Sequence, residues 1–324
     1  MITFNSLNFR TWSKLGLRGS FSAIASFAIA EEYSSSLIVT ADLGYLSGLD
    51  RFKEKYPNRL INVGIAEQNM IGIGAGLADE GHIVFATTYA TFATMRSCEQ
   101  VRHFMGYMKT NLKLIGSGAG LVMGFSGNTH YTIEDISMLR AIPNMTIVSP
   151  ADSTEAVKAC MAAAEFQGPV YIRLTGGLNV PMVYKEDYNF RIGKAVIVRE
   201  GNEVTFIVTG IIISNVIQAA DILATKGIFA RIVNMHTVKP LDSEMLENVV
   251  QDSSLIVSVE EHSRIGGLGA AVAECVCGMA KRPPVLRIGI DDEFKHAGDY
   301  SYLLYQNRLT PEQIATATLD RLRL

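Results

Sequence analysis

The sequence predicts an α/β protein with two domains, each built on a mostly parallel sheet flanked by helices. Three observations indicate this. Short β-branched runs alternate with segments of helical periodicity, a stretch of linker composition interrupts the alternation at 175–189, and 324 residues suffice for about two domains. Hydrophobic residues make up 48% of the chain, which is enough for large cores. We expect the domains to span 1–180 and 190–324.

In the first domain, β-branched apolar runs predict buried strands at 37–40, 83–86, 112–116, 145–149 and 170–174. Helical periodicity predicts helices at 19–32, 67–80, 94–108, 134–141 and 153–166. The apolar run at 21–30 has a charged lead-in, as an export signal would. Because Ser22 and Ser26 interrupt it at helical spacing, we expect an amphipathic helix instead.

The second domain repeats the alternation on a smaller scale. Strands are expected at 204–208, 230–234, 255–259 and 285–288. Helices are expected at 214–226, 242–251, 266–280 and 311–322. The sequence has no run of about eighteen apolar residues, so no membrane span is expected.

Composition also limits the partners. The net charge is -3 with both signs scattered, which argues against nucleic acid and anionic membranes. The four cysteines, at 98, 160, 275 and 277, lack zinc-type spacing, and the last two are too close for an ordinary disulfide. We expect reduced thiols in a cytoplasmic protein.

The most informative stretch is 61–70, where an apolar strand-like run passes through Glu67 into a small-residue helix. A carboxylate at such a junction can enter the crevice of an α/β sheet. It is also favoured there by the helix dipole alone. The segment Ala66-Glu67-Gln68 resembles the pyrimidine-binding half of transketolases and their thiamin-diphosphate relatives, and the resemblance covers nearly the whole chain. It implies that Glu67 hydrogen-bonds the coenzyme's aminopyrimidine and supports its acid–base chemistry.

Other coenzyme-binding residues are implied by the same resemblance. Tyr89 and Phe92 match aromatics that line the pyrimidine, and Met95 stands where the family has a further aromatic. Asp42 and Leu43 match a segment that orders a loop and supports the coenzyme from beneath. Without the resemblance, the two aromatics would be core residues and Asp42 a turn cap.

Substrate-binding residues are implied as well. His130 matches a histidine that faces the substrate and moves protons, while Ser126 replaces a sugar-binding aspartate. Gly118 stands where transketolases have a second active-site histidine and deoxyxylulose-phosphate synthases an arginine. These departures put an ordinary pentose-phosphate substrate in question.

A substrate phosphate has three candidate ligands by the same resemblance. Arg18 and Arg173 match phosphate-binding arginines, whose planar forks suit phosphate oxygens, and Ser47 matches a phosphate-binding serine. The alternative for each arginine is a position on the surface or at a strand end. Segments 237–242 and 260–269 resemble the transketolase C-terminal domain.

The family's metal motif, Gly-Asp-Gly, is not found in the sequence. In the family this motif holds Mg²⁺ and the diphosphate, and it belongs to a separate domain. We therefore expect no metal ligands here. An N-terminal diphosphate-binding subunit would supply them in an α2β2 assembly, and the chain would be inactive alone.

The resemblance implies a transferase that moves a two-carbon ketol unit from a ketose, with or without a phosphate, to an aldose. Three alternatives remain open at this stage. They are the β subunit of a 2-oxo acid dehydrogenase, a deoxyxylulose-phosphate synthase-like enzyme, and a non-catalytic half that only heterodimerises.

Overall fold

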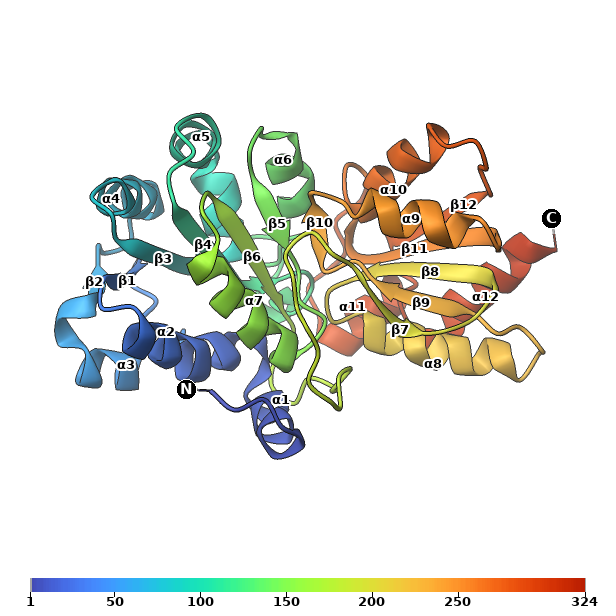
Figure 1. Ribbon diagram of the computed structural model, residues 1–324, viewed down its shortest axis with the longest axis horizontal. Helices are drawn as coiled ribbons and strands as arrows, with labels where there is room; N and C mark the ends of the chain where they lie inside the picture. The colour runs from blue at the N-terminus through green and yellow to red at the C-terminus, as the bar shows by residue number, and fades with distance from the viewer. Residues whose placement is uncertain (1, 324) are drawn as a thin grey trace.

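The computed structural model describes residues 2–323, which form two α/β domains side by side (Figure 1). The first sheet comprises β1 (Ser36–Thr40), β2 (Leu60–Asn62), β3 (Ile83–Tyr89), β4 (Leu112–Ala119), β5 (Thr146–Val148), β6 (Val170–Thr175) and β10 (Thr237–Lys239). The second sheet comprises β7 (Val196–Arg199), β8 (Glu203–Thr209), β9 (Arg231–Asn234), β11 (Ser253–Ser263) and β12 (Val285–Ile290).

The strand order is β10-β5-β6-β4-β3-β1-β2 in the first sheet and β12-β11-β8-β9-β7 in the second. Neighbouring strands are parallel except in the pairs β10–β5 and β7–β9. The predicted fold class is therefore confirmed.

The first half of the chain contributes α1 (Ser6–Ser20), the π-helix η1 (Phe21–Ala25), α2 (Ser26–Glu32), α3 (Asp50–Lys55), the 3-10 helix η2 (Pro57–Arg59), α4 (Glu67–Asp79), the π-helix η3 (Phe92–Arg96), α5 (Cys98–Gln100), the π-helix η4 (Val101–Tyr107), the 3-10 helix η5 (Gly124–Ser126), α6 (Asp135–Ala141) and α7 (Ser153–Glu165). The second half contributes α8 (Ile213–Ala224), α9 (Ser243–Val250), α10 (Leu268–Cys277), α11 (Tyr300–Gln306) and α12 (Pro311–Leu322).

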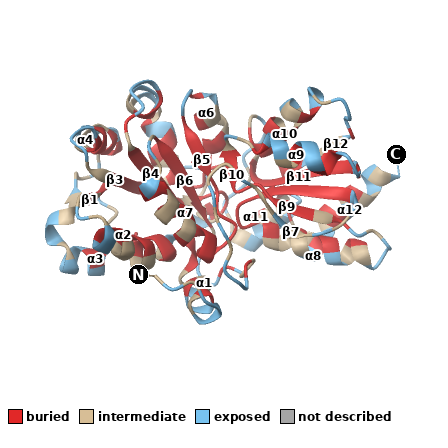
Figure 2. Cartoon of the chain, viewed as in Figure 1, coloured by how far each residue is buried: buried red, intermediate tan, exposed pale blue. Residues whose placement is uncertain are grey.

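Helices cover both faces of each sheet because the central strands, such as β4, β6 and β8, are buried on both sides. On the first sheet, α1, α2 and α7 pack around Phe21 and Phe85 on one face, while α4, η4 and α6 pack around Met70 and Val84 on the other. In the second domain, α8 and α12 cover one face, and α9 and α10 cover the other. Figure 2 shows the buried strands in red between helices whose outer faces are exposed.

Every predicted strand and helix corresponds to an observed element, most with shifted ends. The helix expected at 94–108 is divided into η3, α5 and η4, with a turn at Ser97. Strand β3 continues past residue 86 to Tyr89. The helix predicted at 19–32 is the end of a longer helical segment that begins at Ser6 and passes through the π-helix η1. Elements α3, α11, β7 and β10 were not predicted.

Strand β10 crosses from one domain to the other. It belongs to the second half of the chain, yet it pairs antiparallel with β5 of the first sheet, with Thr237 opposite Val148. In Figure 1 it lies at the centre of the molecule, between the two domains. Its backbone hydrogen bonds join the domains into one structure.

A buried ion pair also holds the domains together. Arg173, on β6, is 1% exposed, and its Nε donates to Asp135 Oδ2 at 2.8 Å. Its Nη2 donates to the carbonyls of Thr132 and of Glu261, a residue of the second domain, at 3.2 and 3.1 Å. Burial alone would raise the pKa of Asp135, but the nearby Arg173 and other hydrogen-bonding neighbours lower it.

Two ionisable residues beside this pair belong to β11. Glu260 accepts hydrogen bonds from the backbone N–H groups of Leu268 and Gly269, at the start of α10, while burial raises its pKa to about 7. Burial lowers the pKa of His262 to about 4. Its Nε2 accepts from the N–H of Ser137 at 3.3 Å, so the neutral imidazole fits this site.

The linker between the domains is fixed at several points. The Asp152 carboxylate accepts from the N–H of Val183 and Tyr184, and burial raises the pKa of Asp152 to about 6. The hydroxyls of Tyr184 and Tyr188 donate to Glu155 at 3.2 and 2.6 Å. The linker composition therefore marks a segment without helix or strand, but not a loose one.

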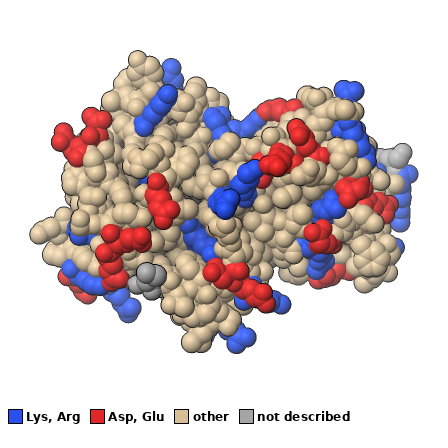
Figure 3. Space-filling view, viewed as in Figure 1, with Lys and Arg blue, Asp and Glu red and all other residues tan. Residues whose placement is uncertain are grey.

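The four cysteines are unpaired, as predicted. None of the helices in the described residues has the length and apolarity that crossing a membrane requires. On the face shown in Figure 3, positive and negative side chains are interspersed, and no continuous field of one sign forms.

Candidate active site

The site is built where strands of the first sheet end and the chain turns into helices. Glu67 is the first residue of α4, directly after the loop that follows β2. It is 3% exposed, although it carries a carboxylate. Its Oε2 lies 2.8 Å from Arg96 Nη1. A buried carboxylate needs such a partner, because desolvation of an unpaired charge is costly.

An aromatic cluster lies beside this ion pair. Tyr89 ends β3, Phe92 begins η3, and His130 lies in the loop after η5. The ring centroids are 5.5 Å apart for Phe92 and His130, 6.1 Å for Tyr89 and Phe92, and 6.2 Å for Tyr89 and His130. The structure thus brings three of the predicted site residues together from separate segments.

Arg96 connects the cluster to Glu67, and sequence reasoning missed it. Its guanidinium carbon lies 4.2 Å from the centroid of the Phe92 ring while the same group pairs with Glu67. Phe92 and Arg96 lie four residues apart within one helical turn. That spacing is the signal that could have identified Arg96.

The loop after β1 is tied to the segment that leads into Glu67. Asn62 Oδ1 accepts from the N–H groups of Asp42 and Gly64, both at 3.0 Å, and Asn62 Nδ2 donates to Asp42 Oδ1 at 2.9 Å. Asp42 is exposed and has φ +57. Its carboxylate therefore helps to order this loop, in which Leu43 is half-buried and Ser47 is buried.

Gly118, Ser126 and Thr129 lie near this cluster in the chain segments that lead to His130. Gly118, on β4, has φ +66, and a Cβ there would lie 2.9 Å from Met123 Cγ and 3.6 Å from Tyr89. A larger residue at this position would therefore press on the cluster. Ser126 is exposed at the end of η5. The Nδ1 of His130 is 2.9 Å from the Thr129 hydroxyl, which fixes the ring.

The two candidate phosphate-binding arginines lie in different surroundings. Arg18 is exposed in the last turn of α1, and within residues 2–323 no hydrogen bond or ion pair ties it to Glu67 or His130. Arg173 lies in the domain interface with its Nε and Nη2 donors engaged. The structure does not bring Arg173 into the aromatic cluster, so its phosphate role stays a prediction.

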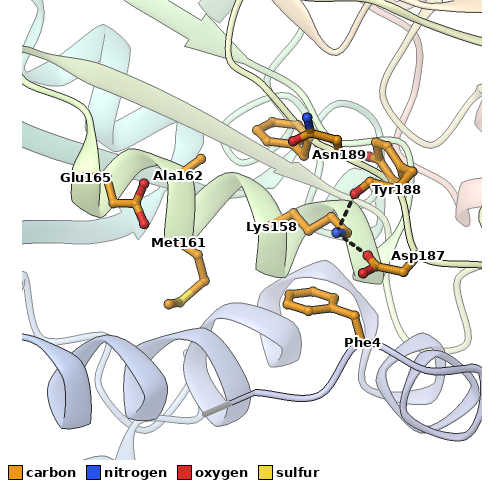
Figure 4. Close-up of a pocket in the computed structure, with 9 residues that line it drawn as sticks. Phe4, Lys158, Met161, Ala162, Glu165, Asp187, Tyr188 and Asn189 are labelled. Carbon is orange, nitrogen blue, oxygen red and sulfur yellow. Dashed lines mark hydrogen bonds and ion pairs between the residues drawn. The ribbon is translucent and has the colours of Figure 1, made fainter.

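A separate hollow of about 550 Å³ lies between the N-terminal segment, α7 and the linker (Figure 4). Lys158 Nζ donates there to Asp187 Oδ1 at 2.5 Å and to the Tyr188 carbonyl at 2.7 Å, and it lies 4.1 Å from the centroid of the Phe4 ring. None of the predicted site residues lines this hollow. The chemistry-bearing residues and this hollow therefore occupy different places.

Within residues 2–323, no group of three or more His, Cys, Asp or Glu side chains is arranged to hold a metal ion. The carboxylate, the aromatic rings and the histidine instead form a site suited to a flat, hydrogen-bonding ligand. The fold and the site together define a two-domain α/β chain in which a buried carboxylate, an arginine and aromatic rings meet after strands of the first sheet.

Comparison with known proteins agrees with both domains. The transketolase pyrimidine-binding domain matches residues 20–179, and the transketolase C-terminal domain matches residues 193–314. The 6-deoxy-6-sulfo-D-fructose transketolase subunit SqwH of Clostridium sp. is 40% identical over 89% of each chain. An apulose-4-phosphate transketolase subunit of Phocaeicola vulgatus is 36% identical, over 90% of this chain and 93% of the relative.

A solved structure described as "Split gene transketolase, inactive beta4 tetramer" is also similar, with a TM-score of 0.86 and 36% identity. It covers 95% of this chain, and the match spans 98% of that chain. The chain therefore belongs to the transketolase family, and its two domains are the pyrimidine-binding and C-terminal domains of that family.

Proposed function

We propose that this chain is the C-terminal subunit of a split, thiamin-diphosphate-dependent transketolase. The reaction would move a two-carbon ketol unit from a ketose to an aldose. The observation that carries the proposal is the meeting of buried Glu67 with Tyr89, Phe92 and His130 in a pyrimidine-binding domain. Relatives of nearly the same length are transketolase subunits, which supports the same activity.

The residues present fit an aminopyrimidine ring. A flat group, the guanidinium of Arg96, already lies over Phe92 and bonds to Glu67, so the space accepts a planar group that shares a proton with the carboxyl. In our proposal Glu67 hydrogen-bonds the ring, and Tyr89 and Phe92 pack against it. When bound, the coenzyme supplies the nucleophilic carbon. Asp42 keeps the neighbouring loop in place, so that Leu43 can support the coenzyme.

His130 is proposed to act on the substrate. Its ring is fixed by the Thr129 hydroxyl and by edge contacts with Tyr89 and Phe92, while part of the residue remains exposed. An imidazole held in this way can give or take a proton at a substrate oxygen. A substrate phosphate, if present, would be bound by Arg18, with the exposed Ser126 lining the approach, whereas Ser47 is buried.

We further propose that a partner subunit supplies the Mg²⁺ ligands and the diphosphate site, in an α2β2 assembly. Large apolar side chains near the site are exposed and suit burial by a partner: Tyr45 is 81%, Ile65 79% and Phe125 71% exposed. The solved split transketolase described as an inactive tetramer of β chains agrees with a chain that needs a partner.

The proposal is tested by assembling the chain with an N-terminal subunit that carries the Gly-Asp-Gly motif. Sugar exchange is expected, in a screen of ketose donors against aldose acceptors. Decarboxylation of a 2-oxo acid with an artificial electron acceptor would instead indicate a dehydrogenase subunit. Condensation of a 2-oxo acid with an aldehyde phosphate would indicate a deoxyxylulose-phosphate synthase-like enzyme.

Replacement of Glu67 by glutamine separates catalysis from assembly. We expect Glu67→Gln to lower kcat by about 10²–10⁴-fold, because an amide cannot perform the acid–base role of a carboxylate. The complex should still form, as gel filtration would show. Unchanged turnover in a correctly assembled Glu67→Gln complex would leave only a scaffolding role for this chain.

A further inference from the structure

Arg96 makes two contacts that are unusual for one surface arginine. Its Nη1 lies 2.8 Å from Glu67 Oε2, and its guanidinium carbon lies 4.2 Å from the centroid of the Phe92 ring. The arginine side chain is 47% exposed, whereas the Glu67 side chain is 4% exposed. One partner can thus move into solvent while the other cannot.

The two contacts are also the two features by which this site would recognise an aminopyrimidine. A guanidinium is planar, presents its face to an aromatic ring and directs N–H groups to a carboxylate in the same plane. An aminopyrimidine stacked near Phe92 and bonded to Glu67 needs that same position. The guanidinium and the ring therefore compete for one carboxylate and one aromatic face.

We infer that Arg96 is a displaceable occupant of the coenzyme-ring site. It neutralises the buried Glu67 carboxylate while the site lacks a ring, and it swings out into solvent when the ring binds. This inference rests on the proposed coenzyme function. Arg96 is a positioning residue in this view, because it acts by holding Glu67 until the ring replaces it.

The main chain at Arg96 is held in place, so the side chain can move without it. Gln68 Nε2 donates to the Arg96 carbonyl at 3.2 Å, which fixes the end of η3 against the first turn of α4. The contacts of the side chain itself are confined to Glu67 and Phe92 among the interactions of the described residues. Displacement then costs one ion pair and one ring contact, with no change of the main chain.

If Arg96 occupies the coenzyme-ring site, its removal should change the affinity for the coenzyme in a direction that other roles do not predict. Removal of Arg96 should strengthen coenzyme binding, because the ring no longer has to displace a competitor. An arginine that merely oriented Glu67 in the loaded site would give the opposite result, since its removal would weaken binding. The sign of the change therefore separates the two roles.

The experiment measures binding of thiamin diphosphate, with excess Mg²⁺, to the assembled pair by titration calorimetry. Arg96→Ala is expected to lower Kd by about 3- to 30-fold, the combined effect of one half-exposed ion pair and one cation–π contact. The ratio between wild type and variant should shrink at high salt, because salt screens the ion pair. Arg96→Lys retains the charge without the planar face, so its Kd should lie between those of the wild type and Arg96→Ala.

Arg102→Ala serves as the matched control, since Arg102 is exposed in the neighbouring helix η4 and has no ion pair within residues 2–323. It should bind the coenzyme as the wild type does. Unchanged or weaker binding by Arg96→Ala, in a pair whose wild type binds, would overturn this inference alone. A wild-type pair without coenzyme binding would remove the proposed function and this inference together.

Discussion

Replacement of Arg173 by methionine tests whether this residue holds the two domains together. The change removes a guanidinium that is 1% exposed and that bonds to Asp135, Thr132 and Glu261. The Asp135 carboxylate, itself 0% exposed, keeps the Tyr171 hydroxyl at 2.7 Å but loses its arginine. Removing one partner of a buried ion pair typically costs about 3–5 kcal/mol.

We expect the free energy of unfolding of Arg173→Met to fall by that amount. Two carbonyls also lose a donor, at about 1–3 kcal/mol for each group left unsatisfied, so the upper half of the range is favoured. Urea denaturation followed by far-UV circular dichroism measures the change. Removing both charges, in Arg173→Met with Asp135→Leu, should restore part of the loss, because no charge then remains unpaired.

The control is Arg199→Met. Arg199 pairs with Asp221 on the surface, where the side chains are 34% and 63% exposed, so its loss should cost less than about 1 kcal/mol. An Arg173→Met variant as stable as this control would refute the interface role. If that stable variant also bound a phosphorylated acceptor poorly, the phosphate role implied by the family resemblance would be supported instead.

Two further predictions concern the interface and the start of the chain. The pKa of about 4 for folded His262 lies below the usual 6.5, so its neutral form stabilises the fold above pH 6.5, and this contribution is lost as the pH falls towards 4. As the pH falls over that interval, the free energy of unfolding of the wild type should therefore decrease more steeply than that of His262→Gln, by up to about 1.4 kcal/mol per pH unit in urea titrations. Equal pH dependence in the two proteins would contradict a neutral, buried His262. Gly16 has φ +69 and ψ 178, and a Cβ there would lie 2.0 Å from the Gly177 carbonyl oxygen. We expect Gly16→Ala to cost at least about 1–3 kcal/mol in thermal unfolding, and more than Gly227→Ala, whose Cβ would meet nothing within 4 Å. Equal losses of stability in the two variants would show that the close approach of Gly16 to Gly177 does not determine the cost.

The alternation of apolar runs was sufficient to predict the fold class and most elements. Runs such as 112–116 and 204–208 are buried on both faces, so their signal does not depend on a particular neighbour. Strand β10 is short, and what makes it a strand is its pairing with β5, which lies far away in the sequence. The composition of the segment 237–239 alone therefore could not predict this strand.

The candidate site was predictable to a similar extent. Family resemblance led to Glu67, Tyr89, Phe92 and His130. The structure places Glu67 and Phe92 in contact with Arg96, and Tyr89 and His130 beside Phe92. The resemblance did not identify Arg96, because an arginine in a sequence has many possible roles until its partners are known. The resemblance also gave no sign that Arg173 faces the other domain, since burial of this guanidinium depends on Asp135 and Glu261 from distant segments.

The crossover of β10 bears on how the molecule can be made or divided. The first sheet is complete only after residue 239 has left the ribosome, so the N-terminal half must wait for part of the C-terminal half before it closes. Cutting the gene at the linker would leave β5 with a bare backbone edge, which invites pairing with strands of other molecules. The two domains have separate sheets and cores, but the first sheet is complete only when a strand from the second half of the chain pairs with it.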